Sequence, residues 1–364
     1  MASIITRIFC APLRAVGLPA VTTAGSGQLL AFIEALRAAA PAVKSVIPLS
    51  CAAGAAMQVV ILERNRSVAR RAARHFATIG ATTTLVEDPA AVVAALPGAS
   101  LLCSDACDGD LVVELLRNRP SVRGLLWTAE PIKHSLRLMH DCPAISHVLA
   151  RKDTESLPRP WELLMAARRI LHGDGAPPFA AYLDWGAQLM SLSVRTTADA
   201  DRAVDEVQEF IVRTQTSKRV SEMFGELAHE LLLNAMYDAP VDAMGHPMFA
   251  ADRKANITLA ATQQPQVLLG SDGSTLALQV RDPFGRLQRR DVVGGLLRGL
   301  SGGAMDQSHG GAGLGMLVCH NSAAALFFDV IKGRATEVTA VLDLDLNLRE
   351  FRTSAKSLHF FASY

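Results

Sequence analysis

The hydrophobic positions between residues 57 and 172 form short continuous apolar runs that alternate with amphipathic segments. Five of these runs are expected to form strands, at 59–62, 82–87, 100–105, 124–130 and 147–151. The segments that follow them are expected to form helices, at 67–80, 89–98, 111–118, 132–140 and 160–171. Strands that are apolar throughout must be covered on both faces. The alternation therefore predicts a parallel, flavodoxin-like sheet flanked by helices.

The pattern changes after residue 186. Residues 187–199 end in an alternating strand, and two amphipathic helices are expected at 198–214 and 217–239. Strands are then expected at 255–262, 266–270 and 275–282, helices at 289–300 and 313–325, and a closing hairpin at 326–333 and 336–346. This order predicts a second α/β unit, a sandwich of one mostly antiparallel sheet with helices on one face.

Breaks in the pattern divide the chain into five parts. Residues 1–56 are rich in Ala, Pro, Gly and Ser and are expected to be a disordered extension. The first domain is 57–172, and the linker at 173–186 contains two adjacent prolines that end the preceding helix. The second domain is 187–350. The apolar residues of the tail at 351–364 are expected to pack on a domain or a partner.

Composition excludes several classes of protein. The net charge of +1 argues against a general nucleic-acid surface. The six cysteines form no CxxC pair, which argues against a disulfide framework or a zinc site. No apolar run approaches the roughly 20 residues that span a bilayer. We therefore expect a cytoplasmic protein.

Polar residues follow several of the first-domain strands. Glu63 follows the first strand, Asp105 ends the third, Thr128 lies at the end of the fourth, and Lys152 follows the fifth. In parallel sheets, sites lie at the carboxyl ends of strands. The set resembles the receiver domain of two-component response regulators. The resemblance implies that Asp105 is a phospho-acceptor, with Glu63 in a Mg²⁺ pocket and with Thr128 and Lys152 gripping the phosphoryl oxygens.

The first domain also departs from the receiver pattern. Arg64 stands where that family has a second acid, and the loop after the acceptor is reduced to 106–110. Arg151 is the alternative candidate for the position of the family's lysine, because Lys152 lies one place late. An arginine in an acid pocket repels Mg²⁺, so the alternative is a degenerate receiver fold that serves docking or dimerisation.

Four short motifs follow one another in the second domain. They are an acid and an amide four residues apart on a helix, an Asp-x-x-Gly turn, a glycine-rich turn before a helix, and a late threonine. The residues are Glu230 and Asn234, Asp282 and Gly285, Gly311, Gly313, Leu314 and Gly315, and Thr336. Residues four apart share one helix face, and free N–H groups at a helix N-terminus favour phosphate. Together the motifs predict a nucleotide site.

The same motifs resemble the boxes of the GHKL (Bergerat-type) ATPase superfamily, which includes gyrase, heat-shock chaperone, mismatch-repair and histidine-kinase ATP-binding domains. The resemblance covers 187–345 and implies ATP and Mg²⁺ as cofactors. It implies that Asn234 binds Mg²⁺, that Glu230 acts as a general base and that Asp282 binds the adenine amino group. Gly285 would let the backbone approach the base, and the glycines at 311–315 would cradle phosphates.

His229 offers a rival chemistry, because the sequence from His229 to Leu231 also looks like a histidine-kinase phospho-acceptor box. In that case a further acid-and-amide box should precede Asp282, and the sequence contains none. The segment 191–211 instead resembles the lead-in of the anti-sigma-factor serine kinases. We therefore interpret His229 as a helix residue beside the nucleotide site.

These resemblances imply an ATP-binding signalling protein that transfers the γ-phosphoryl group to a protein Ser, Thr or His. One alternative is a non-catalytic docking module with a vestigial nucleotide site. Another is an ATPase switch that phosphorylates no protein. The expected partner is a protein, either a phosphoryl acceptor or a regulated factor, and the sequence is compatible with a homodimer. Neither nucleic acid nor a membrane is expected as a partner.

Overall fold

Apart from the edge strand at Thr82–Val86, mostly buried strands form the parallel half of the sheet, as in β1 (Gln58–Leu62), where residues 59–62 are fully buried. The computed structural model describes residues 57–242, 244–301 and 314–363, so the extension predicted at 1–56 lies outside the described residues. The other strands of this half are β2 (Thr82–Val86), β3 (Ala99–Asp105), β4 (Arg123–Thr128) and β5 (Ile145–Ala150). No helix within the described ranges is long and apolar enough to cross a membrane.

The strand order of this parallel unit (residues 57–172) is β2-β1-β3-β4-β5, with every pair parallel. This is the 2-1-3-4-5 order of flavodoxin-like folds, so the predicted fold class is confirmed for this half. Its α-helices are α3 (Arg66–Thr78), α4 (Val92–Ala95), α5 (Gly109–Arg117), α6 (Lys133–Asp141) and α7 (Pro160–His172). Short 3-10 turns at Pro89–Ala91 and Ala106–Asp108 precede α4 and α5.

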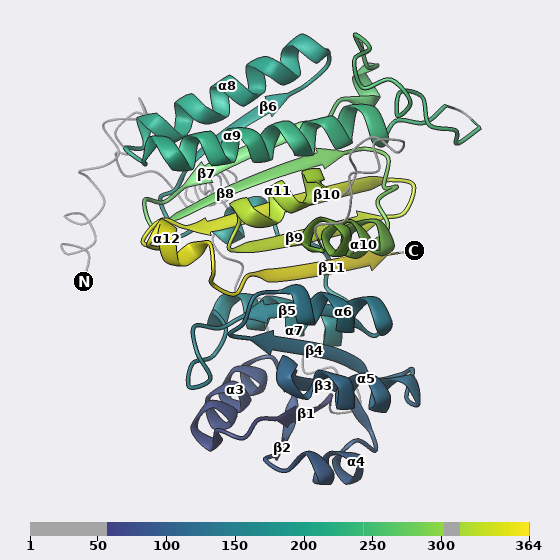
Figure 1. Ribbon diagram of the computed structural model, residues 1–364, viewed down its shortest axis with the longest axis vertical. Coiled ribbons are helices and arrows are strands. Elements are labelled where there is room, and N and C mark those ends of the chain that lie inside the picture. The colour runs from purple at the N-terminus through teal and green to yellow at the C-terminus, as the bar shows by residue number, and fades with distance from the viewer. Residues whose placement is uncertain (1–56, 243, 302–313, 364) are drawn as a thin grey trace, which may run out of the picture. The chain divides into compact units, whose positions relative to one another are not determined.

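The antiparallel unit (residues 187–363) contributes the rest of the sheet, in the order β11-β9-β10-β8-β7-β6. Its strands are β6 (Gln188–Ser193), β7 (Gln266–Ser271), β8 (Thr275–Asp282), β9 (Ala325–Ile331), β10 (Ala335–Asp343) and β11 (Ser357–Ser363). Its helices are α8 (Thr197–Arg213), α9 (Lys218–Leu233), α10 (Arg289–Leu300), α11 (Leu314–Ser322) and α12 (Leu348–Phe351). Figure 1 shows α8, α9 and α11 over one face of this sheet, as the hydrophobic pattern predicts.

Two local predictions need correction. The strand predicted at 255–262 is wrong, because this segment follows the start of α8 instead of a neighbouring strand. The Ile257 N–H donates to Thr197 Oγ1 (2.8 Å), and the Leu259 N–H donates to the Arg195 carbonyl (2.9 Å). The helix predicted at 217–239 is α-helical only to Leu233 and continues as one π-helical turn, Asn234–Asp238.

The back of the antiparallel sheet is covered by the segment predicted as a linker. Phe179, Tyr182 and Leu183 are buried there and pack with Phe327 of β9 and Val341 of β10. Part of 173–186 is therefore a packed element that covers apolar side chains. Helix α7 ends before the two prolines, at His172, and Gly173 follows it in the left-handed region (φ +70°).

The C-terminal tail joins the two halves. β11 pairs antiparallel with β5, where Leu358 lies opposite Val148, and parallel with β9 along its whole length. The residues that the structure describes thus contain one sheet of eleven strands. The expectation that the tail packs on a domain is confirmed, and its apolar residues form an internal strand.

A buried acid–histidine pair lies beneath this junction. Glu162 of α7 and His359 of β11 are both fully buried, with 2.7 Å between Glu162 Oε1 and His359 Nε2. Arg159 forms an ion pair with Glu162 (2.7 Å) and donates to Ser357 Oγ (3.2 Å). Burial alone raises the pKa of Glu162, but the charge of Arg159 and the hydrogen bonds from His359 and Ser357 lower it to about 2.

We expect Glu162→Gln to destabilise the protein by about 3 kcal/mol at neutral pH, because it removes one partner of a buried ion pair. The folded-state pKa is depressed, so the stabilisation by Glu162 is present above its unfolded-state pKa of about 4.3 and is lost as pH falls toward 2. Urea unfolding between about pH 5 and pH 2 should therefore show a shallower loss in the variant. Glu155→Gln, at an exposed position, is the control and should match wild type.

Candidate functional site

A cavity of about 340 Å³ lies between helices α9, α10 and α11 and strands β8 and β10. Five residues predicted from the sequence line it: Glu230, Asn234, Asp282, Gly315 and Thr336. Leu314 opens α11 but is 57% exposed and does not line the cavity. Gly311 and Gly313 lie outside the described residues. The fold thus brings together residues that are more than 100 positions apart in the sequence.

Helix α9 supplies the acid and the amide. Glu230 lies in its last turn, and Asn234 opens the π-helical turn, where the Ala239 N–H donates to the Asn234 carbonyl (2.9 Å). Such π turns often mark functional sites. A Cβ on Gly315 would lie 2.2 Å from Glu230 Oε2, so a larger residue there would displace this carboxylate. His229 is exposed and does not line the cavity.

Asp282 ends β8 and is buried in the cavity wall. Its Oδ1 accepts from the N–H groups of Phe284 (2.8 Å) and Gly285 (3.3 Å). Burial raises the pKa of the Asp282 carboxyl, and these hydrogen bonds oppose the rise. Thr336 lies opposite Asp282 on β10. Its buried hydroxyl makes no hydrogen bond of normal geometry with a described residue.

The backbone conformation and the neighbours of Gly285 explain why this position is glycine. Its φ is +62°, in the left-handed region that favours glycine. A Cβ there would lie 2.1 Å from the Ile331 carbonyl oxygen, in the turn that joins β9 and β10. The Gly285 carbonyl also accepts from the Gly333 N–H (3.1 Å). Close contact with this hairpin therefore accounts for the glycine without a ligand, and Gly285 does not line the cavity.

The cavity wall also contains charged residues that the motifs did not select. These are Asp238, Arg253, Arg286, Asp291 and Arg298. Asp238 forms an ion pair with Arg253, and burial raises the pKa of its carboxyl despite that arginine. The four-residue spacing from Glu230 through Asn234 to Asp238 is the sequence signal that could have found it. Arg253 lies in an irregular loop and carries no such signal.

Two buried polar groups on the wall, Arg286 Nη1 and Thr336 Oγ1, make no hydrogen bond of normal geometry with a described residue. The Thr336 hydroxyl still lies close enough to Asp282 to help lower the pKa of that carboxyl, which burial raises. A buried polar group without a partner is unfavourable by about 1–3 kcal/mol. A phosphorylated ligand that bonds to these groups would remove that penalty.

In the parallel unit, an arginine fills the predicted acid pocket. The Arg151 side chain is 2% exposed and forms ion pairs with Glu63 (2.9 Å) and Asp105 (2.6 Å). Trp127 Nε1 also donates to Glu63 Oε2 (3.2 Å). The guanidinium of Arg151 therefore lies where the receiver resemblance implies a metal ion and a lysine ammonium, while Lys152 is exposed.

Thr128 and Arg64 also form hydrogen bonds or ion pairs within the protein. Thr128 Oγ1 accepts from the Glu130 N–H (3.0 Å). Arg64 forms an ion pair with Asp108, outside the buried pocket. Among the described residues, no group of three or more His, Cys, Asp or Glu side chains could hold a metal ion. The acids here are matched by arginines.

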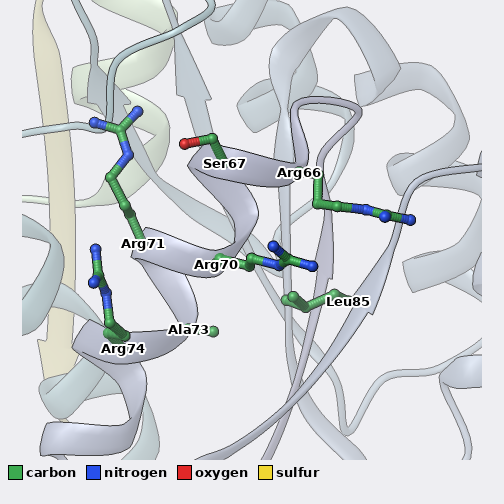
Figure 2. A pocket seen from close by; sticks show the side chains of 7 residues that line it. All are labelled: Arg66, Ser67, Arg70, Arg71, Ala73, Arg74 and Leu85. Carbon is green, nitrogen blue, oxygen red and sulfur yellow. The ribbon is translucent and has the colours of Figure 1, made fainter.

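Figure 2 shows a basic hollow over α3, away from every predicted site residue. It is lined by Arg66, Ser67, Arg70, Arg71, Ala73, Arg74 and Leu85. Arg66 Nε pairs with Glu87 (2.6 Å), and Arg71 donates to the Glu155 carbonyl. Arg70 and Arg74 are exposed and form no ion pair with a described residue. This surface favours anions but lacks the converging acid and amide of the cavity.

Comparison with known proteins gives no family. No family model matches the chain, and no curated protein matches it. Among solved structures, the response regulator DrrB of Thermotoga maritima matches with 10% identity and a TM-score of 0.28, covering 33% of this chain and 54% of that chain.

Two other similar structures are single receiver domains. A signal receiver domain of an HD domain-containing protein from Pseudomonas fluorescens Pf-5 matches with 18% identity over 33% of this chain and 97% of that one, with a TM-score of 0.28. A CheY-like receiver domain from Methanospirillum hungatei JF-1 matches with 11% identity over 33% and 96%, with a TM-score of 0.29. Likenesses this weak carry no argument, so the flavodoxin-like assignment rests on strand order and parallel pairing.

Proposed function

We propose that this protein is an ATP-binding signalling protein whose antiparallel unit is a GHKL-type nucleotide-binding domain. The observation that carries the proposal is the convergence of four separate segments on one cavity. Helix α9, strand β8, the start of α11 and strand β10 bring an acid, an amide, a buried carboxyl and a hydroxyl together. This arrangement supports a polar, phosphorylated ligand.

The two kinds of polar group would bind different parts of ATP. The buried Asp282 carboxylate would accept from the amino group of adenine, beside the hydroxyl of Thr336. Arg286 and Arg298 would contact phosphate oxygens, which guanidinium groups match in geometry. The Asn234 side-chain oxygen would be the protein's ligand to Mg²⁺, which usually keeps waters and phosphate oxygens as its other ligands. Bound Mg²⁺ would neutralise part of the phosphate charge.

Glu230 is the proposed general base for phosphoryl transfer. The bond from the γ-phosphorus to its bridging oxygen breaks, and a bond to an acceptor oxygen or nitrogen forms. ADP leaves, and the acceptor's proton passes to the Glu230 carboxylate. The acceptor is a Ser, Thr or His of a partner protein. Positioning and charge stabilisation carry most of the catalysis in this class of reaction.

The parallel unit is proposed as a receiver-like module that works without phosphorylation. Arg151 already supplies the positive charge that balances Glu63 and Asp105. A divalent cation would have to displace a buried guanidinium held by two ion pairs. This favours a docking or regulatory role for the unit over phosphate acceptance at Asp105.

The proposed nucleotide site predicts Mg²⁺-dependent binding of ATP. Titration calorimetry should detect Mg²⁺-dependent ATP binding by wild type, weakened about tenfold or more in Asn234→Ala, because the variant loses a metal ligand. His229→Ala is the matched control, since His229 lies on the same helix but is exposed and outside the cavity. Absence of Mg²⁺-dependent binding by wild type would rule out both the kinase and the ATPase.

The second prediction separates transfer from hydrolysis. Wild type incubated with γ-labelled ATP and a cell extract should label a protein, and Glu230→Ala should not, because it lacks the base. Release of phosphate without a labelled protein, in wild type but not in Glu230→Ala, would point to an ATPase switch. ATP binding with neither activity would point to a non-catalytic docking module.

The third prediction concerns the arginine in the acid pocket. Arg151→Ala should lower the free energy of unfolding by about 3 kcal/mol, since the buried Glu63 carboxylate and the partly buried Asp105 carboxylate lose their counter-charge. Arg64→Ala is the control and should cost less than about 1 kcal/mol, because the pair it forms is solvent-exposed on the arginine side. Both are measured by urea unfolding. Labelling of Asp105 in wild type by acetyl phosphate and Mg²⁺ would contradict the phosphorylation-independent role.

A further inference from the structure

Helix α10 contacts both the candidate cavity and the parallel unit. Asp291, in the first turn of the helix, lines the cavity. Gln288, the residue before the helix, and Arg298, near the C-terminal end of the helix, also line it. Anything that fills the cavity therefore contacts α10. The same helix packs against α6 of the parallel unit and against α11 of the antiparallel unit.

Arg289, the first residue of α10, bonds to the other unit and does not line the cavity. Its guanidinium donates to three backbone carbonyls: Met139, Cys142 (3.3 Å) and Ile145 (2.7 Å). These carbonyls belong to the last turn of α6, the residue that ends it and the start of β5. One side chain of the antiparallel unit thus forms hydrogen bonds with the α6–β5 connection of the parallel unit.

The guanidinium of Arg289 is well suited to bind the carbonyl groups at the end of α6. The last carbonyls of a helix lack partners within the helix and carry the negative end of its dipole, so a guanidinium satisfies several of them at once. Arg289 forms no ion pair with a carboxylate in the described residues, and its pKa is lowered by burial. Its charge is therefore balanced mainly by these carbonyls, and movement of α10 would break the contact.

Apolar packing makes the connection continuous. Val292 and Leu296 of α10 are buried in the same hydrophobic cluster as Leu138 and Met139 of α6 and Val280 of β8. The cavity wall, α10 and the end of α6 are thus in contact through one packed core, and packed cores transmit small shifts because they have few voids.

We propose that Arg289 is a positioning residue that links nucleotide binding in the cavity to the α6–β5 connection of the parallel unit. The proposal rests on the proposed ATP site. Binding that favours one position of α10 favours the arrangement of α6 that fits it, and a partner bound at α6 must change ATP affinity by the same factor. The parallel unit therefore regulates the nucleotide site through Arg289 without contributing a residue to the cavity.

The test compares Arg289→Ala with Arg290→Ala in the full chain. Arg290 is the next residue of the same helix, but it is exposed and pairs only with Asp291 (3.8 Å). We expect Arg289→Ala to change the dissociation constant for Mg²⁺-ATP about fivefold or more, and Arg290→Ala to leave it within about twofold. Arg289→Lys, with one small cationic group for three carbonyls, should give an intermediate value.

Hydrogen exchange supplies a measurement that a purely structural anchor would not affect. In wild type and Arg290→Ala, ATP should change the exchange of amides at 138–148, which contact no cavity residue through hydrogen bonds. In Arg289→Ala this change should be lost, while the exchange of α9 amides still responds to ATP. If Arg289→Ala does not fold, the wild-type experiment decides alone, and no ATP-dependent change at 138–148 overturns the proposal.

The outcomes separate the two proposals. No ATP binding by wild type overturns the nucleotide site and the coupling with it. ATP binding with equal affinity in wild type and Arg289→Ala, and with the same exchange response at 138–148, overturns the coupling alone. A lower melting temperature of Arg289→Ala with unchanged affinity and unchanged response also overturns it, because that is the result for a structural anchor.

Discussion

Backbone pairing of β11 with β5 on one side and β9 on the other satisfies two sheet edges at once. Without this strand, each half of the sheet would end in a row of unpaired N–H and C=O groups, which is unfavourable in a buried position. Glu162 and His359 add a buried polar pair beneath the strand. Because the pair is formed by α7 and the C-terminal strand, the two halves depend on each other for correct burial of charge. The junction also sets where α10 meets α6.

The two halves of the sheet differ in how their charged and polar side chains are paired. In the parallel unit, the acids at the strand ends are balanced by the guanidinium of Arg151. In the antiparallel unit, Arg286 Nη1 and the Thr336 hydroxyl line a cavity beside the buried Asp282 and make no hydrogen bond of normal geometry with a described residue. Carboxylates balanced by a buried guanidinium favour a structural or docking role, whereas such polar groups around a cavity favour a ligand. The chemistry of this protein is therefore expected in its second half, with the first half as a neighbour that influences it.

Much of this architecture was predictable because its signals are local. Four strands of the parallel unit, β1, β3, β4 and β5, are largely apolar and buried, and the four-residue spacing of Glu230 and Asn234 places both on one helix face. The segment 255–262 has a strand-like composition, yet it pairs with the start of α8, since composition does not specify which backbone groups lie nearby. The apolar residues of the tail at 351–364 predict packing but not a central joining strand. Its partners β5 and β9 are distant in the sequence.

Local sequence patterns predict the types of secondary-structure element, their order and the chemistry that each motif offers, because helix period, strand alternation and turn residues act over a few positions. Which of those groups come into contact depends on tertiary packing. It placed Arg151, not Lys152, between Glu63 and Asp105, gave Gly285 a role in packing the β9–β10 turn, and directed Arg289 to the carbonyls of α6. Each of these depends on distances between segments far apart in the chain, which are fixed by packing of the whole sheet.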